Sequence, residues 1–288
     1  MIKVLKDINE LIMFKHSVFS LPFIFIAMVV ASDLDGGSPW FGWRLLFLGL
    51  LAAISARNFA MGFNRYADRD IDKYNPRTAS RPSVDGRVGK RNMQLFIILN
   101  GLIFIVVAYW VNTLAFMLAI PILVVLAGYS LFKRFSALAH LVLGISLGLA
   151  PIAGVVAVSE QIPVWAVMLS LGVMFWVAGF DLLYSLQDME YDKANDLHSI
   201  PSRFGSKCTF FISKIFHGLT ILFWALFVGI AGLGVWAWLG VFISAGVLFQ
   251  EHRIVSQDFS KIDKAFFTLN GYLGIIFFIL IIIDRVGG

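Results

Sequence analysis

The chain has 288 residues, of which 59% are hydrophobic and 14% are charged, with a formal net charge of +5 at pH 7. This apolar content exceeds what a soluble core needs, so it excludes a soluble enzyme and predicts a polytopic helical membrane protein. The apolar runs do not alternate as barrel strands do, and no basic stretch is separable from them, so we expect neither a membrane β-barrel nor a nucleic-acid partner.

About nine apolar stretches are each near the ~20 residues that cross a bilayer, which predicts an all-α membrane bundle forming a single domain over residues 1–288. We interpret the first stretch as a retained span, because it lacks the small-x-small cleavage site of a signal peptide. In chain order the predicted spans cover residues 16–33, 43–63, 93–111, 113–132, 137–158, 163–186, 208–230, 232–250 and 264–284.

Lys and Arg gather in alternate segments of the chain. They are frequent before the first span and in the loops after the second, fourth, sixth and eighth spans, whereas the other loops are almost free of them. Basic loops of membrane proteins remain in the cytoplasm. The alternation therefore supports nine spans, with the N-terminus and the basic loops on the cytoplasmic side.

The first of two acidic clusters follows the second span. Asn64, Asp68 and Asp72 are four residues apart, so they lie on one face if the chain is helical there. Carboxylates at this spacing repel each other unless a cation lies between them. Asp70 falls off this face and is expected to be an ordinary loop charge.

The second cluster, about 120 residues later, places Asp181, Tyr184, Asp188 and Asp192 on one helical face, with Glu190 off it. A single such cluster at a span end is usually a set of loop charges. Two clusters at the same membrane level favour a functional site, because ionisable groups at membrane depth are costly. Oxygen ligands suit Mg²⁺, and two facing clusters would hold two Mg²⁺ ions around a diphosphate whose remaining charge Arg and Lys neutralise.

These motifs resemble those of the UbiA superfamily of intramembrane prenyltransferases. The family's first motif, NxxxDxxxD, is matched by Asn64, Asp68 and Asp72, and its second by Asp188 and Asp192 with Tyr184 a turn earlier. Two further segments resemble the family as a whole: "NPRTASRP" (Asn75–Pro82) and "YSLFKR" (Tyr129–Arg134). Two others resemble the branch that holds the 4-hydroxybenzoate enzymes and a related enzyme of the futalosine menaquinone route: "YSLQDMEYDKANDLHSIPSRFG" (Tyr184–Gly205) and "FKHSVFSLPF" (Phe14–Phe23).

The resemblance implies a nine-helix fold and a location in the bacterial inner membrane. It implies transfer of a polyprenyl chain from a polyprenyl diphosphate to an aromatic acid, with Mg²⁺ as cofactor and membrane lipid as surroundings. Loss of diphosphate leaves an allylic cation that an electron-rich ring carbon attacks, and water must be excluded from this step.

Carried over residue by residue, the resemblance implies three roles. The expected metal ligands are Asn64, Asp68, Asp72, Asp188 and Asp192. The expected catalytic residues are Asp68, Asp188, Tyr184 and Asp181. Tyr184 would line the acceptor site or stabilise the cation through its ring, and the competing explanation is that it only anchors the protein at the membrane interface. The expected diphosphate-binding residues are Asn64, Arg65, Arg77, Arg81, Lys133, Arg134 and Arg57, and simple positive-inside charge is the competing explanation for the loop residues among them.

Arg57 lies inside the second span, where a buried arginine needs an anion. That anion is a diphosphate oxygen, an acceptor carboxylate, or a structural partner such as Asp181. His16, His140 and His198 lie near the predicted cytoplasmic level. They are conceivable proton acceptors, although packing roles are the simpler expectation.

One departure from the resemblance concerns the acceptor. Many hydroxybenzoate enzymes have a basic residue near the position of Met13, and then a Pro and a Gly where this chain has Ser17 and Phe19. The departure favours a dihydroxynaphthoate of menaquinone synthesis over 4-hydroxybenzoate of ubiquinone synthesis. Haem farnesylation, a transporter with a carboxylate relay, and a membrane scaffold are the remaining alternatives.

Overall fold

The computed structural model describes residues 7–8, 10–12, 21–258, 262 and 265–287. Over these residues the chain is helical and contains no strand, which confirms the predicted all-α class. The chain forms two compact units, one of Met1–Ser17 with Phe47–Leu131 and the other of Val18–Leu46 with Phe132–Gly288. The first acidic cluster belongs to the first unit and the second cluster to the other.

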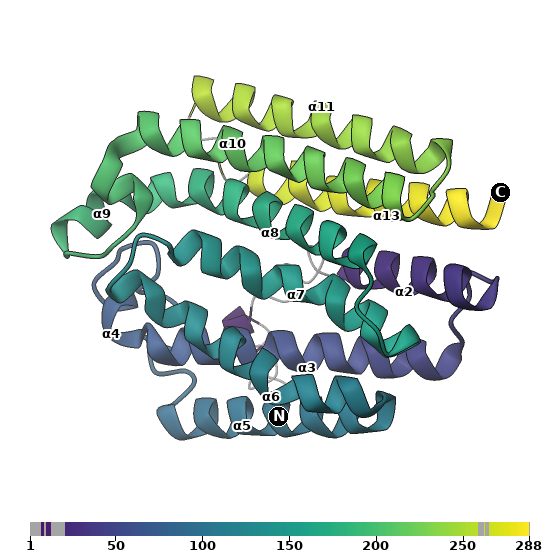
Figure 1. Ribbon diagram of the computed structural model, residues 1–288. Coiled ribbons are helices and arrows are strands. Elements are labelled where there is room, and N and C mark those ends of the chain that lie inside the picture. The colour runs from purple at the N-terminus through teal and green to yellow at the C-terminus, as the bar shows by residue number, and fades with distance from the viewer. Residues whose placement is uncertain (1–6, 9, 13–20, 259–261, 263–264, 288) are drawn as a thin grey trace. The chain divides into compact units, whose positions relative to one another are not determined.

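The first unit consists mainly of three long helices. They are α3 (Trp43–Ala67), whose first residues belong to the other unit, α5 (Lys90–Val111) and α6 (Thr113–Gly128), and a short α4 (Arg69–Asp72) follows α3 (Figure 1). Glycines let α3 and α5 approach closely, because Gly62 lies against Ile97 and Gly101 lies against Phe59. Across the same contact, the amide of Asn58 donates a hydrogen bond of 3.1 Å to the amide oxygen of Asn100.

Asn112 separates α5 from α6. Its backbone is extended, and its side chain accepts a hydrogen bond of 2.8 Å from the backbone N–H of Ala115, which caps the start of α6. The predicted third and fourth spans are therefore two helices, as the sequence indicates.

In the second unit, six long helices pack in a closed cycle. Around it, α2 contacts α7, α7 contacts α8, α8 contacts α10, α10 contacts α11, α11 contacts α13, and α13 returns to α2 (Figure 1). Short helical segments lie between some of the long helices. The bounds are α2 (Leu21–Gly36), η2 (Tyr129–Arg134, which starts in the first unit), α7 (Ala139–Ser159), α8 (Val164–Tyr184), η3 (Ser185–Asp188), α9 (Met189–Ala194), α10 (Ile200–Ile230), α11 (Val235–Gln257), η5 (Ala265–Leu269) and α13 (Asn270–Gly287).

Aromatic side chains from four of these helices form the core of the second unit. Phe23 of α2 and Phe277 of α13 both stack on Trp224 of α10, at centroid distances of 5.3 and 4.9 Å, and Trp176 of α8 lies 5.1 Å from Phe23. All four side chains are buried. Such rings supply a large apolar contact area, so the cycle of helices closes around a packed centre.

Glycines on α7 bring its neighbours close. A Cβ at Gly144 would collide with the backbone oxygen of Met174 on α8, and a Cβ at Gly154 would collide with the backbone oxygen of Ile24 on α2. Small residues give membrane helices this close approach, which replaces the hydrophobic driving force that lipid does not supply. The register between α7 and α8 is fixed in this way, and it positions residues near the start of α7.

Seven helical stretches of the described chain are long and apolar enough to cross a bilayer, which supports an integral membrane protein. The predicted first span lies partly outside the described residues, since α2 is described only from Leu21. The helix α11 contains the polar stretch Gln250–Arg253 before its last turn. The count of nine spans stays a prediction. The seven stretches are Trp43–Ala67, Lys90–Val111, Thr113–Arg134, Ala139–Ser159, Val164–Ala194, Ile200–Ile230 and Phe267–Gly287.

The helix of the predicted seventh span, residues 208–230, starts earlier than that span, since α10 begins at Ile200. Ser199 and Ser202 form a capping box there, and Pro201 occupies the first turn. At Gly205, φ is 76° and ψ is 172°, so the helix breaks and resumes. Hydropathy alone found only the part after this break.

Candidate active site

The first acidic cluster lies where α3 ends. Asp68 leaves the helical conformation, with φ −90° and ψ 4°, and α4 then continues to Asp72. The backbone N–H of Asp68 still donates to Asn64 O at 2.9 Å, and that of Asp72 to Asp68 O at 2.8 Å. The four-residue spacing predicted for this cluster is therefore kept, with one turn following another.

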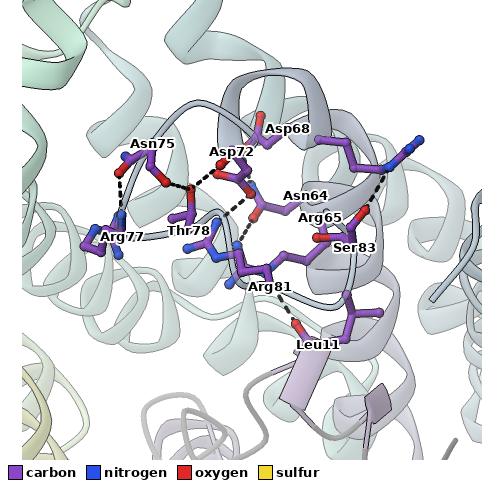
Figure 2. A network of polar contacts seen from close by, with 11 residues as sticks. Leu11, Asn64, Arg65, Asp68, Asp72, Asn75, Arg77, Thr78, Arg81 and Ser83 are labelled. Carbon is purple, nitrogen blue, oxygen red and sulfur yellow. Dashed lines mark hydrogen bonds and ion pairs between the residues drawn. The ribbon is translucent and has the colours of Figure 1, made fainter. Parts of the chain in front are cut away.

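Hydrogen bonds orient the side chains of this cluster (Figure 2). The amide nitrogen of Asn64 donates to Asp68 Oδ2 at 3.0 Å, and its oxygen accepts from Arg65 Nη1 at 2.9 Å. Arg65 is buried and also donates from Nε to the backbone oxygen of Leu11 at 3.3 Å. Arg65 thus fixes the amide of Asn64 so that its nitrogen faces the carboxylate of Asp68.

The loop after α4 folds back over the cluster. Arg81 Nη1 forms an ion pair of 2.6 Å with Asp72 Oδ2, and Thr78 Oγ1 donates to the backbone oxygen of Asp72 at 3.0 Å (Figure 2). Asn75 Oδ1 accepts from the backbone N–H of Arg77 at 2.9 Å, which shapes the turn. The segment Asn75–Pro82 therefore places Arg81 at the acidic cluster.

Arg87 ties the beginning of the chain to this loop. Its two terminal nitrogens bind the Glu10 carboxylate at 2.8 Å each, and its Nε binds Asp85 at 2.7 Å. Burial acts to raise the pKa of Asp85, but the hydrogen bonds and charge of Arg87 outweigh it and lower that pKa. Glu10 precedes Leu11, so this contact holds the carbonyl that Arg65 uses.

Arg57 donates from Nη1 to the backbone oxygen of Ile12 at 3.1 Å. Arg57 and Arg65 thus both bind carbonyls of the N-terminal segment. These contacts could not be predicted from the sequence. The acceptors are backbone carbonyls 45 and 54 residues away, and every residue has such a carbonyl whatever its side chain.

The second cluster is built differently from the expected single helical face. α8 ends at Tyr184, a 3₁₀ turn covers Ser185–Asp188, and α9 starts at Met189. Because a 3₁₀ turn has three residues instead of 3.6, the predicted common face of Asp181, Tyr184, Asp188 and Asp192 is wrong as an unbroken α-helical face. Asp188 precedes α9 with φ −98° and ψ 1°.

Asp192 lies among polar groups of its own unit. The Ser199 hydroxyl and the side chains of Asp188, Lys133 and His140 lie near enough to act on its carboxylate electrostatically. The backbone oxygen of Lys133 accepts from His198 N–H at 2.9 Å, which ties η2 to the start of α10. Arg134 is exposed beside it. Glu190 and, in the first cluster, Asp70 are also exposed, as expected of ordinary loop charges.

Asp181 lies one turn before the end of α8 and pairs with a histidine. Its Oδ2 is 2.7 Å from His140 Nδ1, and His140 lies in the first turn of α7. A close link between His140 and Asp181 was not expected from the sequence, since 41 residues separate them. His16, by contrast, lies outside the described residues, as do Met13, Ser17 and Phe19.

The donor sets fit a hard cation, because the clusters offer carboxylate and amide oxygens. Within the described part of the chain, no three His, Cys, Asp or Glu side chains gather closely enough to hold a metal ion. Mg²⁺ commonly takes one or two protein carboxylates and completes its shell with water and phosphate oxygens. The pair Asp68 and Asp72, or Asp188 and Asp192, suits that chemistry.

The fold and these clusters define an all-α integral membrane protein with acidic and basic groups gathered at helix ends. Residues 20–281 match the model of the UbiA prenyltransferase family, and the chain belongs to that family.

Solved structures and curated relatives share this architecture. The chain superposes on the apo structure of a UbiA homolog from Aeropyrum pernix K1 with a TM-score of 0.83 and 31% identity, covering 93% of this chain and 98% of that one. A UbiA homolog from Archaeoglobus fulgidus bound to DMAPP and Mg²⁺ matches with a TM-score of 0.75 and 18% identity over 96% and 99% of the chains, which shows a common fold. A 4-hydroxybenzoate octaprenyltransferase of Herminiimonas arsenicoxydans is 29% identical over 262 residues, covering 90% of this chain and 89% of the relative.

Proposed function

We propose that the protein transfers a polyprenyl chain from a polyprenyl diphosphate to an aromatic acid, with Mg²⁺ as cofactor. One observation carries the proposal: both acidic motifs place an aspartate, Asp68 or Asp188, in the same backbone conformation, with φ near −90° and ψ near 0°, directly before a short helix. Residues in this sparsely populated region are frequent at active sites. The name of the hydroxybenzoate relative supports an aromatic acceptor, and the DMAPP and Mg²⁺ of the Archaeoglobus fulgidus homolog support the donor and the cofactor.

In this proposal Asn64, Asp68, Asp72, Asp188 and Asp192 hold the cation and the diphosphate in one catalytic domain. Bound Mg²⁺ would supply positive charge that stabilises the departing diphosphate. The basic residues around the clusters supply the remaining charge, and Tyr184 lines the acceptor site. The proposed diphosphate-binding residues are Asn64, Arg57, Arg65, Arg77, Arg81, Lys133 and Arg134.

The favoured acceptor is a dihydroxynaphthoate of menaquinone synthesis. We favour it because Met13, Ser17 and Phe19 differ from the residues that many hydroxybenzoate enzymes have at these positions. The second candidate is 4-hydroxybenzoate, which the name of the relative favours. Both are electron-rich aromatic acids, so the chemistry at the diphosphate is the same for either.

Paired substitutions test the proposal. Asp68→Asn and Asp188→Asn each keep size but remove a carboxylate, so prenylated product and Mg²⁺-dependent diphosphate release should fall by about 100-fold or more. The matched controls are Asp70→Asn and Glu190→Gln, which change exposed carboxylates in the same motifs and should leave both rates near wild type. Equal activity of Asp68→Asn and Asp70→Asn would refute the site. Loss of ion flux without any prenylated product would favour the transporter alternative.

A further inference from the structure

His140, which is buried, and Asp181, which is partly exposed, form a pair at one end of the contact between α7 and α8. His140 Nδ1 lies 2.7 Å from Asp181 Oδ2. An ionised carboxylate only accepts hydrogen bonds, so Nδ1 carries the proton and Nε2 is left with a lone pair. The carboxylate therefore fixes both the tautomer and the direction of the imidazole ring.

The other ring nitrogen of His140 is buried and has no hydrogen-bond partner among the described residues. The residue as a whole is only 6% exposed. A buried basic nitrogen without a partner carries a cost. His217 Nε2 and His252 Nδ1, in a contact between α10 and α11, are also buried without a hydrogen-bond partner among the described residues, so the carboxylate at Nδ1 is what sets His140 apart. This arrangement suits a nitrogen that receives a proton from something the protein binds.

The pair lies beside the second acidic motif. A protonated His140 would act on Asp192 through charge, as Lys133 does, although neither ring nitrogen forms a hydrogen bond with Asp192. The first turn of α7 and the last turns of α8 thus bring a base to the same end of the unit as Asp188 and Asp192.

A second histidine pair provides a contrast. His217 Nδ1 lies 3.0 Å from His252 Nε2, in a buried contact between α10 and α11. His217 also packs against Gly179, where a Cβ would collide with its ring. Neither ring of this pair hydrogen-bonds to a carboxylate in the described chain, so we interpret it as packing.

We propose that His140 is the general base that removes the ring proton of the aromatic acceptor, and that Asp181 is the residue that positions it. This inference rests on the proposed prenyl transfer. The C–O bond to the diphosphate breaks and its electron pair leaves with the diphosphate. A ring carbon forms a C–C bond to the allylic cation, and that carbon then loses its hydrogen as a proton to Nε2. The C–H electron pair restores the aromatic ring, and Asp181 stabilises the imidazolium that results.

An isotope experiment on His140→Gln tests the base. The acceptor that the wild type prenylates is deuterated at the ring carbon that receives the chain, and single-turnover product formation is timed for both isotopic forms. Because positioned general bases contribute about 100-fold or more, product formation should fall by about that factor. It should also gain a primary isotope effect larger than that of the wild type, since proton removal becomes rate-limiting.

The matched control is His252→Gln, the same substitution at a buried histidine whose ring contacts His217 and which we interpret as packing. It should keep the wild-type isotope effect, because any loss of packing slows both isotopic forms equally. A His140→Gln enzyme with the wild-type rate, or with a slower rate but no added isotope effect, overturns the proposal, because a structural role slows both isotopic forms equally.

Asp181→Asn provides the second variant, and it carries the test alone if His140→Gln does not fold. It keeps the side-chain size but removes the charge that stabilises the imidazolium, so the same added isotope effect is expected, and its absence overturns the proposal. If the wild type forms no prenylated product with any aromatic acid, the proposed function itself fails. If the wild type is active and neither variant gains an isotope effect, only the role of His140 fails.

Discussion

At the scale of single residues, Asp68 and Asp188 share a backbone conformation that the sequences of their motifs do not predict. Their φ values are −90° and −98°, with ψ values of 4° and 1°. Each aspartate follows or ends a helical segment and precedes a short helix. A tight turn therefore positions its carboxylate and the neighbouring acidic side chains of the motif. The spacing of the acidic residues was predictable from sequence. The 3₁₀ turn at Ser185–Asp188 was not, because no Gly or Pro marks it.

Arg81 offers a test at this scale. Its guanidinium pairs with Asp72 at 2.6 Å and holds that carboxylate in place. Arg81→Met should lower kcat/KM for the prenyl diphosphate by about 10- to 100-fold, because a hydrogen bond to a charged group contributes about 1.5–3 kcal/mol. Arg91→Met removes an exposed arginine from the start of α5 and should change kcat/KM less than about twofold. Equal effects of the two substitutions would mean that Arg81 contributes only general positive charge.

At the scale of elements, the break in α10 positions a contact of the second motif. Gly205 has φ 76° and ψ 172°, a conformation that is nearly restricted to glycine. The turn before this break starts at Ser199, whose hydroxyl lies near enough to Asp192 to act on its carboxylate. Hydropathy predicts the long apolar part of such a helix, whereas the capped turn before it depends on polar signals that an apolar pattern does not contain.

Gly205→Ala should therefore destabilise the protein by about 1–3 kcal/mol and lower its activity, because a Cβ is strained at this φ. Gly218→Ala is the control in the same helix. A Cβ at Gly218 would meet no atom within 4 Å and the φ there is not positive, so alanine should stabilise the helix by up to about 1 kcal/mol. Thermal unfolding in detergent measures both effects. The same change in the unfolding temperature for both variants would contradict the strained break.

A buried polar chain joins three helices of the second unit. Trp176 Nε1 donates to Asn270 Oδ1 at 2.7 Å, and Asn270 Nδ2 donates to Glu251 Oε1 at 2.8 Å. Asn270→Leu would leave both neighbours without this partner, at a cost of about 2–4 kcal/mol in the free energy of unfolding. Asn92→Leu, at an exposed position, should cost within about 0.5 kcal/mol. Unfolding by denaturant in mixed micelles measures the difference, and equal costs would show that the chain adds no stability.

At the scale of the whole molecule, basic and aromatic residues occupy different connections along the chain. Exposed aromatic side chains flank the connections that carry few Lys and Arg, namely those between α2 and α3, α5 and α6, and α10 and α11. Trp and Tyr favour the membrane interface, and basic loops favour the cytoplasm. We propose that the N-terminus and the basic loops are cytoplasmic in a bacterial inner membrane. These aromatic residues are Trp40, Trp43, Tyr109, Trp110, Trp236 and Trp238.

Single cysteines test this orientation. Cys208 is the only cysteine of the chain, so Cys208→Ala gives a background without thiols. In intact bacterial cells an impermeant maleimide should label Ser38→Cys, which is exposed between α2 and α3. It should label Ser256→Cys, exposed in the last turn of α11, only after the membrane is disrupted. The reverse pattern would invert the proposed topology.

The packing of the whole molecule was only partly predictable. Composition gave the all-α membrane class, and the acidic motifs gave the family, because both depend on residue types at short spacing. The closed cycle of helices depends on contacts such as Gly154 with Ile24, and the pair of His140 with Asp181 joins residues that are distant in the sequence. Neither contact leaves a periodic signal, so only the three-dimensional structure reveals it.

The most direct measurement is the mass of the product formed by the purified protein. The protein is incubated in lipid with Mg²⁺, a long-chain prenyl diphosphate, and 4-hydroxybenzoate or 1,4-dihydroxy-6-naphthoate in parallel, with a chelator in a matched reaction. We expect a prenylated aromatic acid that disappears with the chelator, and prenylated naphthoate if the favoured acceptor is right. If no prenylated acid forms and no diphosphate is released, the central claim of Mg²⁺-dependent prenyl transfer is contradicted.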